Sequence, residues 1–303
     1  MGSVQVWAVS AAGAAVLLVV LRDVFHTLWH PSGRGQLSRR VMAVVWWAGR
    51  RPRARGRASV LAGPLALVVV VFAWVALTAV GFALVYWPHL ADGFALEGAL
   101  EPQQRRGFLD ALYVSLVTLV TLGTLGFGDI VPTADWLRIV VPVQALLGFA
   151  LLTAAVSWVL QIHPALVRRR ALALRLSLLR RVDSAALLTD PQGQLAAPVL
   201  ADLAADLAQA RIDLTQYAET YYFRDSETES SLPAVIEVAV LLSATARTAP
   251  RADVRVGGEL LAHAVADFSR VVDAHFLNGG GGSVADVLAA YAADHGHGTA
   301  HRR

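Results

Sequence analysis

The stretch Thr121-Leu122-Gly123-Thr124-Leu125-Gly126-Phe127-Gly128-Asp129 decides the fold of this chain. It closes an apolar segment, 108–122, that is too short to cross a bilayer, and a longer apolar segment lies on either side. Non-helical backbone at membrane depth is tolerated only where it is buried in protein or lines a water-filled path. The stretch is therefore predicted to line a pore.

Glycine in this stretch has a chemical reason. A pore that passes a dehydrated cation replaces the water shell of the ion with oxygen ligands, and backbone carbonyls aimed at one axis supply them. Successive carbonyls point the same way only if backbone conformations alternate, and some of these conformations are open mainly to glycine. We expect ion ligands from the filter residues Thr124, Leu125, Gly126, Phe127 and Gly128, with the Thr124 hydroxyl innermost. Four copies would close the ring, so a homotetramer is expected.

The filter residues resemble the Thr-Val-Gly-Tyr-Gly-Asp motif of the prokaryotic potassium channel pore family. The resemblance covers residues 60–162 and includes Pro132, Trp136 and Arg138 at familiar spacing. It implies an all-α membrane protein with an outer helix, a re-entrant pore helix and filter, and an inner helix, to which this chain adds an N-terminal span and a C-terminal helical domain. It also implies passive K⁺ conduction with no cofactor and no catalysed reaction. Thr121 and Asp129 stand where the family supports the filter.

The sequence departs from the family pattern at several positions. Leu125 and Phe127 replace Val and Tyr, and Leu116 and Val117 stand where many members carry tryptophans behind the filter. These changes bear on filter stability more than on permeation. Three alternatives therefore stay open: a simple turn between two helices, a cation channel without K⁺ selectivity, and a membrane-anchored helical sensor or scaffold with a vestigial pore.

Composition limits the function classes. The chain has 303 residues, of which 56% are hydrophobic and 16% charged, as expected of a membrane protein with a soluble appendage. It contains no lysine, which excludes a phosphate-loop lysine, a Schiff base and a Ser-Lys dyad. It contains no cysteine, which excludes thiol nucleophiles, thiolate metal sites and disulfides. Composition therefore excludes these chemistries, whereas the expectation that the chain is no enzyme follows from the passive transport that the resemblance implies.

Charge divides the chain into two parts. Residues 1–181 carry 18 Arg against 7 acidic residues, net +11, whereas residues 182–303 carry 8 Arg against 16 acidic residues, net −8. Cytoplasmic anchoring explains a basic membrane part, so nucleic acid is not an expected partner. The predicted domains are an N-terminal span with a basic connection (1–57), a pore domain (58–163) and a cytosolic helical domain (164–303).

Apolar runs predict three spans, at 4–21, 60–87 and 135–161. Nine arginines between Arg22 and Arg57 place that connection in the cytoplasm by the positive-inside rule, and the N-terminus outside the cell membrane. Within the connection, 41–48 is predicted to be an interfacial helix with Trp46 and Trp47 at headgroup level. Tyr86 is predicted to mark the outer boundary of the second span.

A small polar cluster follows the first span. Asp23, His26 and His30 are spaced i, i+3, i+7 and would share one helix face at the membrane boundary. A carboxylate and two imidazoles could bind a metal or sense pH. They could equally be interfacial polar groups that pair with Arg22 or a neighbouring subunit, and no fourth ligand is visible.

The inner helix, 135–161, carries two candidate gating residues. Pro142 removes a backbone donor and should kink the helix, and Gly148 offers either a hinge or close helix packing. Pro164 is expected to end the helix. The face predicted to line the cavity carries Phe149, Leu152, Thr153 and Val156.

The arginines beyond this helix have two interpretations. Arg168, Arg169 and Arg170 could contact anionic lipid at the cytoplasmic face, or they could simply anchor the span.

The C-terminal part is predicted to be helical at 199–222, 234–246 and 253–276, with breaks at Pro233 and Pro250. It shows no glycine-rich nucleotide-binding fingerprint. A glycine-rich linker, 278–283, precedes a short last helix. The tail histidines His295, His297 and His301 are expected to be disordered.

Overall fold

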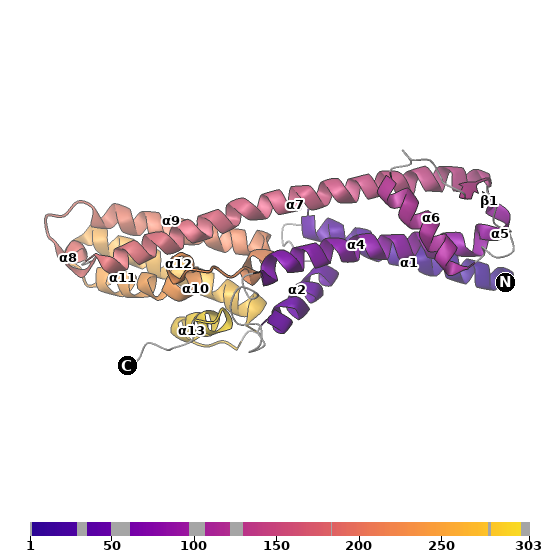
Figure 1. The fold of residues 1–303 in the computed structure, drawn as a ribbon. Coiled ribbons are helices and arrows are strands. Elements are labelled where there is room, and N and C mark those ends of the chain that lie inside the picture. Colours follow the sequence, from indigo (N-terminus) through magenta and orange to yellow (C-terminus); the bar gives the residue numbers. More distant parts are fainter. Residues whose placement is uncertain are drawn as a thin grey trace. The chain divides into compact units, whose positions relative to one another are not determined.

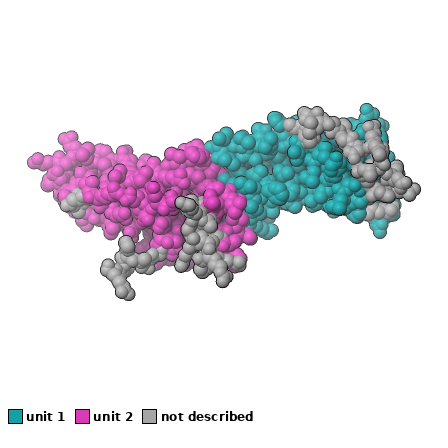
Figure 2. Space-filling model, in the orientation of Figure 1, with its two compact units in different colours: residues 1–43, 66–160 teal, residues 44–65, 161–303 magenta. Residues whose placement is uncertain are grey.

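The computed structural model describes residues 2–28, 35–49, 61–96, 107–121, 130–182, 184–277 and 280–297, and these are almost entirely helical (Figure 1). The predicted filter from Thr124 to Asp129 lies outside the described residues, as do His30, His301 and the side chain of Thr121. The described part divides into two compact units, residues 1–43 with 66–160 and residues 44–65 with 161–303 (Figure 2). Each unit is described by itself below.

The first unit contains the apolar helices. Three helical segments are long and apolar enough to cross a membrane: Ser3–Leu28, Ala62–Gly93 and Asp135–Arg181. They correspond to α1 (Ser3–Leu28), α4 (Ala62–Tyr86) with its short extension, and α7 (Asp135–Arg181). The fourth helix, α6 (Phe108–Thr121), has 14 residues and is therefore about 21 Å long, too short to span. The three predicted spans and the short helix between the last two are confirmed.

Short elements close the loop on either side of α6. A 3-10 turn, η2 (Trp87–His89), leads into α5 (Leu90–Gly93) and then into β1 (Phe94–Leu96). This strand pairs antiparallel with β2 (Ile130–Pro132), so that Phe94 lies opposite Pro132. Gly93 accepts backbone hydrogen bonds from Thr133 (2.8 Å) and Ala134 (3.2 Å). This strand pair was not predicted from the sequence.

Pro164 does not end the inner helix. α7 is continuous over 47 residues, from Asp135 to Arg181, and passes through both Pro142 and Pro164. Proline removes only one backbone donor, a cost of about 3 kcal/mol or more. The buried face of α7 continues past it through Ile162, Ala165 and Leu166, whose packing offsets this cost.

The second unit is a helical bundle. Its main helices are α9 (Ala196–Gln216), α11 (Glu237–Arg247) and α12 (Ala252–Phe276), at the positions that apolar periodicity predicts. Leu203, Leu207, Leu242 and Leu261 lie in their shared core. The shorter elements are α8 (Ser184–Thr189), η3 (Ala218–Tyr222), η4 (Thr228–Ser230), α10 (Leu232–Val235) and α13 (Val284–Asp294).

The helix that precedes the second span also enters this bundle. α2 (Gln36–Gly49) carries Trp46 near its end, and the Trp46 side chain is buried rather than at headgroup level. Its indole Nε1 donates to Asp294 Oδ2 (3.0 Å), and the Arg224 guanidinium lies 4.3 Å from its ring centroid. Trp47 is 56% exposed, so only this neighbour remains available for an interface.

The expectation of a disordered histidine tail is wrong for His295 and His297. Ser283 and Asp286 form a capping box that starts α13, and the chain after this helix packs back onto the bundle. The His295 ring lies against Trp46 and Tyr221, with centroids 5.1 and 4.8 Å away. His297 Nε2 lies 2.9 Å from the Ser231 hydroxyl.

Candidate functional site

The predicted filter is framed by α6 and β2. α6 ends at Thr121 and β2 begins at Ile130, so residues 122–129 connect the two elements. Asp110 lies in the first turn of α6, and its Oδ2 accepts the backbone N–H of Gly107 (3.0 Å). The carbonyl end of α6 therefore directly precedes the filter, where its partial negative charge favours a cation.

A buried polar network holds α6 between the two flanking spans. The Tyr86 hydroxyl donates to Gln144 Oε1 (2.6 Å). The Gln144 amide donates in turn to the Ser115 carbonyl (2.9 Å) and hydroxyl (2.7 Å), and that hydroxyl donates to the Ala79 carbonyl (2.8 Å). These side chains are at most 1% exposed. One chain of hydrogen bonds thus joins α4, α6 and α7.

This network was missed by the sequence analysis. Tyr86 does stand at the end of α4, where the sequence placed the end of its span, but the sequence did not indicate that its side chain is fully buried. A polar side chain in a lipid-embedded helix must find a partner within the protein, since hydrocarbon offers none. The presence of Gln144 and Ser115 in otherwise apolar segments could have indicated a buried hydrogen bond, but the sequence does not show which residue each of them bonds to.

Gly148 allows the inner helix to touch the backbone of α6. A Cβ placed on Gly148 would lie 2.4 Å from the carbonyl oxygen of Leu119. No side chain tolerates that distance without a shift of one helix. The structure therefore supports the packing interpretation of Gly148, whereas hinge roles for Gly148 and Pro142 stay predictions.

The predicted cavity face of α7 is not covered within the first unit. Phe149, Leu152 and Val156 are 51%, 62% and 52% exposed, and Thr153 is exposed beside them. The opposite face is buried through Val141, Ala145, Leu151, Ala155 and Trp158. One apolar side of the inner helix is thus available to line a cavity or to meet another subunit.

Asp23 has a structural role at the cytoplasmic side predicted for α1. Its two carboxylate oxygens accept the backbone N–H groups of Leu37 (2.7 Å) and Ser38 (3.2 Å) in the first turn of α2. Oδ2 also accepts the indole N–H of Trp74 (2.9 Å), which joins α1 and α2 to α4. Asp23 is 4% exposed, so its carboxylate is explained by a buried helix cap. The sensor interpretation with His26 and His30 stays a prediction.

The arginines after the third span bind carboxylates of the second unit. Arg168 makes a two-pronged ion pair with Asp213, with both N–O distances 2.8 Å, and Arg170 Nε lies 2.6 Å from Asp225 Oδ1. Their side chains are 45% and 47% exposed, so contact with lipid stays a prediction for both.

Arg169 is different, because its side chain is only 8% exposed. It donates to the carbonyls of Thr220 and Phe223 and to Asp225 Oδ2 (3.1 Å). The expected lipid contact is therefore wrong for Arg169. The three arginines point in different directions around α7, and only Arg169 is buried against the bundle. The run of three arginines in the sequence does not show which of them will be buried.

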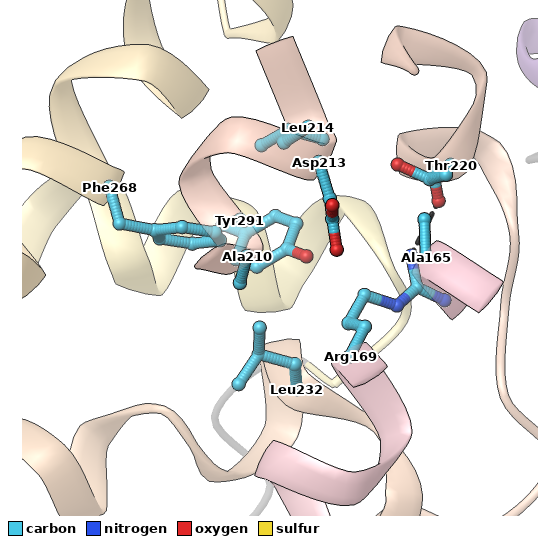
Figure 3. Close-up of a pocket in the computed structure, with 9 residues that line it drawn as sticks. All are labelled: Ala165, Arg169, Ala210, Asp213, Leu214, Thr220, Leu232, Phe268 and Tyr291. Atoms are coloured by element: carbon cyan, nitrogen blue, oxygen red, sulfur yellow. Dashed lines mark hydrogen bonds between the residues drawn. The ribbon is translucent and has the colours of Figure 1, made fainter. Parts of the chain in front are cut away.

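Arg169 also lines a small pocket of the second unit (Figure 3). Asp213 from α9, Tyr291 from α13 and Phe268 from α12 reach into it, and Arg169 Nε is buried without a hydrogen-bond partner. The centre of a water molecule can move there within about 10 Å³. The pocket therefore has room for about one water and is too small for a metabolite.

The first residues of α4 and the last part of α7 belong to the second unit. A Cβ on Gly63, at the start of α4, would lie 2.8 Å from the Phe223 ring. The backbone carbonyls of Thr220 in η3 and of Phe223 accept hydrogen bonds from Arg169 of α7. Phe223 thus contacts both the beginning of α4 and the part of α7 that belongs to the second unit. Within the described ranges, no group of three or more His, Asp and Glu side chains is placed to hold a metal ion.

Comparison with known proteins agrees with this geometry. Residues 65–162 match the model of a family described as ion channel. An uncharacterized membrane protein of Bacillus subtilis (strain 168), YdjJ, is 29% identical over 167 residues, which are 54% of this chain and 46% of that protein. The aligned part therefore spans about half the length of the relative, and no solved structure matches the chain. The matched residues begin in α4, contain α6 and the filter stretch, and end in α7. Residues 65–162 are thus an ion-channel domain of this family, carried by an all-α, multi-pass membrane protein.

Proposed function

We propose that four copies of this chain form a channel that conducts K⁺ passively and selectively through the filter residues Thr124 to Gly128. The observation that carries the proposal is the position of α6. It is too short to span, it is held between two spans by the Tyr86–Gln144–Ser115 network, and it delivers its carbonyl end to the glycine-bearing stretch. This arrangement serves carbonyl coordination of a cation.

Two further features support the same assembly. The exposed apolar side of α7 requires a neighbour or a cavity, and a ring of four inner helices supplies both. The paired strands β1 and β2 join the chain before α6 to the chain directly after the proposed filter, which supports a loop anchored at both ends. The nine arginines after α1 favour an N-terminus outside and a second unit in the cytoplasm. No reaction is catalysed in this proposal, and no cofactor is used.

Flux through purified protein in liposomes tests the proposal. A K⁺ gradient should drive flux that Ba²⁺ blocks, because Ba²⁺ has nearly the size of K⁺ and twice its charge, whereas a Na⁺ gradient should drive little. Equal Na⁺ flux would instead indicate a non-selective cation channel. Absence of flux at any voltage or pH would indicate a sensor or scaffold with a vestigial pore.

A filter variant sharpens the assay. Gly126→Ser should abolish selectivity or conduction while the tetramer still forms, because the alternating backbone depends on glycine. Gly280→Ser is a matched control, since a Cβ at Gly280 would meet nothing within 4 Å. Wild-type reversal potentials in Gly126→Ser would count against the filter assignment.

A further inference from the structure

The part of α7 that lies in the second unit carries an uncovered apolar stripe. Val167, Leu174 and Leu178 are 49%, 43% and 59% exposed, and Ala171 is exposed between them. The opposite face of the same helix is buried, through Leu172, Ala173 and Leu176 in the core of the bundle. The stripe is thus the side of α7 that its own subunit leaves open.

Lipid is a poor occupant for this stripe. A helix of 47 residues is roughly 70 Å long, more than twice the hydrocarbon thickness of a bilayer, which is about 30 Å. Residues 135 to about 157 use up that thickness, so the stripe begins about ten residues beyond it. An apolar stripe that is exposed to water and flanked by arginines is typical of a surface that binds another protein.

The spacing of the stripe identifies the kind of partner. Positions 167, 171, 174 and 178 are separated by four, three and four residues, the alternation of a left-handed helical bundle. Leu160, seven residues before Val167, is 66% exposed on the same side of the helix. Thr153, a further seven residues toward the N-terminus, is exposed as well. The stripe therefore continues the face predicted to line the cavity.

The flanking charges would permit copies of α7 to approach one another. Arg168, Arg170 and Arg175 stand beside the stripe, and in four identical helices they would repel. Each is already paired within its own subunit, with Asp213, with Asp225, and with Asp202 and Asp206. Neutralising these arginines in cis removes the main electrostatic obstacle to a parallel bundle.

We propose that the cytoplasmic extension of α7, residues 167–181, joins the same segment of three further copies in a parallel four-helix bundle below the pore. The proposal rests on the proposed tetrameric channel, because a continuous α7 carries the pore symmetry into this segment. The bundle would hold the lower ends of the inner helices together and so limit the opening that they allow.

Single-cysteine crosslinking of the full-length chain tests the bundle. The natural sequence has no cysteine, so Leu174→Cys and Leu178→Cys each introduce one thiol per subunit. A short bis-maleimide applied in liposomes should convert most of the monomer band of either variant into dimer on denaturing gels. Arg180→Cys is the matched control: it is exposed on the same helix but points away from the stripe, so its band should remain monomeric.

The outcomes separate this proposal from the proposed function. Native mass measurement of each variant reports the tetramer independently of the crosslink. A tetramer that conducts K⁺ but shows no more crosslinking at Leu174→Cys and Leu178→Cys than at Arg180→Cys would overturn the bundle and leave the channel standing. A monomer without flux would overturn both.

Discussion

Acidification should open the contact between α13 and the rest of the second unit, with His295 as the titrating group. Burial lowers the pKa of His295 from its ordinary value of 6.5 to about 4. Hydrogen bonds to the Tyr221 and Tyr291 carbonyls and the charge of Asp294 act in the opposite direction, and the charge of Arg169 adds to the lowering. A neutral imidazole can donate to only one of the two carbonyls, which lie 2.8 and 3.1 Å from its nitrogens.

The sign of the effect follows from the depressed pKa. The folded state binds fewer protons than the unfolded state between pH 6.5 and about pH 4. Stability is therefore fully present above pH 6.5 and is lost as the pH falls toward 4. At pH 5 the two pKa values give a loss of roughly 2 kcal/mol, or about a 30-fold change in the opening equilibrium.

Hydrogen exchange of the full-length protein in detergent measures this loss. Peptides covering 217–224 and 284–297 should lose about 30-fold in protection between pH 7.5 and pH 5, after correction for intrinsic exchange rates. His295→Gln cannot titrate at this position, so it should lose most of the pH dependence; the part that remains is expected from His297, whose pKa is also lowered by burial. His263→Gln, at an exposed position of α12, should retain the wild-type response. Parallel loss of protection in the wild type and His295→Gln would refute the assignment.

Four further substitutions test packing elsewhere. Gly148→Ala should destabilise the protein by an overpacking cost of about 1–3 kcal/mol, partly offset by the helix preference of alanine, about 1 kcal/mol, and so lower the melting temperature in detergent. If Gly148 served only as a hinge, the substitution would change gating and leave the melting temperature unchanged. Gln144→Leu should also lower it, by about 0.6–1.7 kcal/mol for each interhelical hydrogen bond lost, and Tyr86→Phe should lower it less. Arg169→Met should expose η3 to limited proteolysis at a cost of about 3–5 kcal/mol, whereas the exposed control Arg180→Met should behave as wild type.

The sequence by itself determined the spans, the short helix before the filter and the main helices of the second unit. These features follow from local properties, namely the length of an apolar run and the recurrence of apolar residues every three to four positions. The Gly126-Phe127-Gly128-Asp129 motif likewise identified the ion-channel domain, because its chemistry lies within a few consecutive residues. A run of arginines predicts which side of the span is cytoplasmic, but it does not identify the partner of any single arginine.

Only the tertiary structure decided how polar groups are paired. Gln144 finds Tyr86 and Ser115 from other helices, and Arg169 finds carbonyls more than 50 residues away. Pro164 is accommodated because packing on both sides of it outweighs one lost hydrogen bond. His295 is buried because a capping box and three aromatic neighbours, Trp46, Tyr221 and Tyr291, hold the end of the chain in place. A buried polar group is stable only with a partner, and the partner is chosen by the folded arrangement of distant segments.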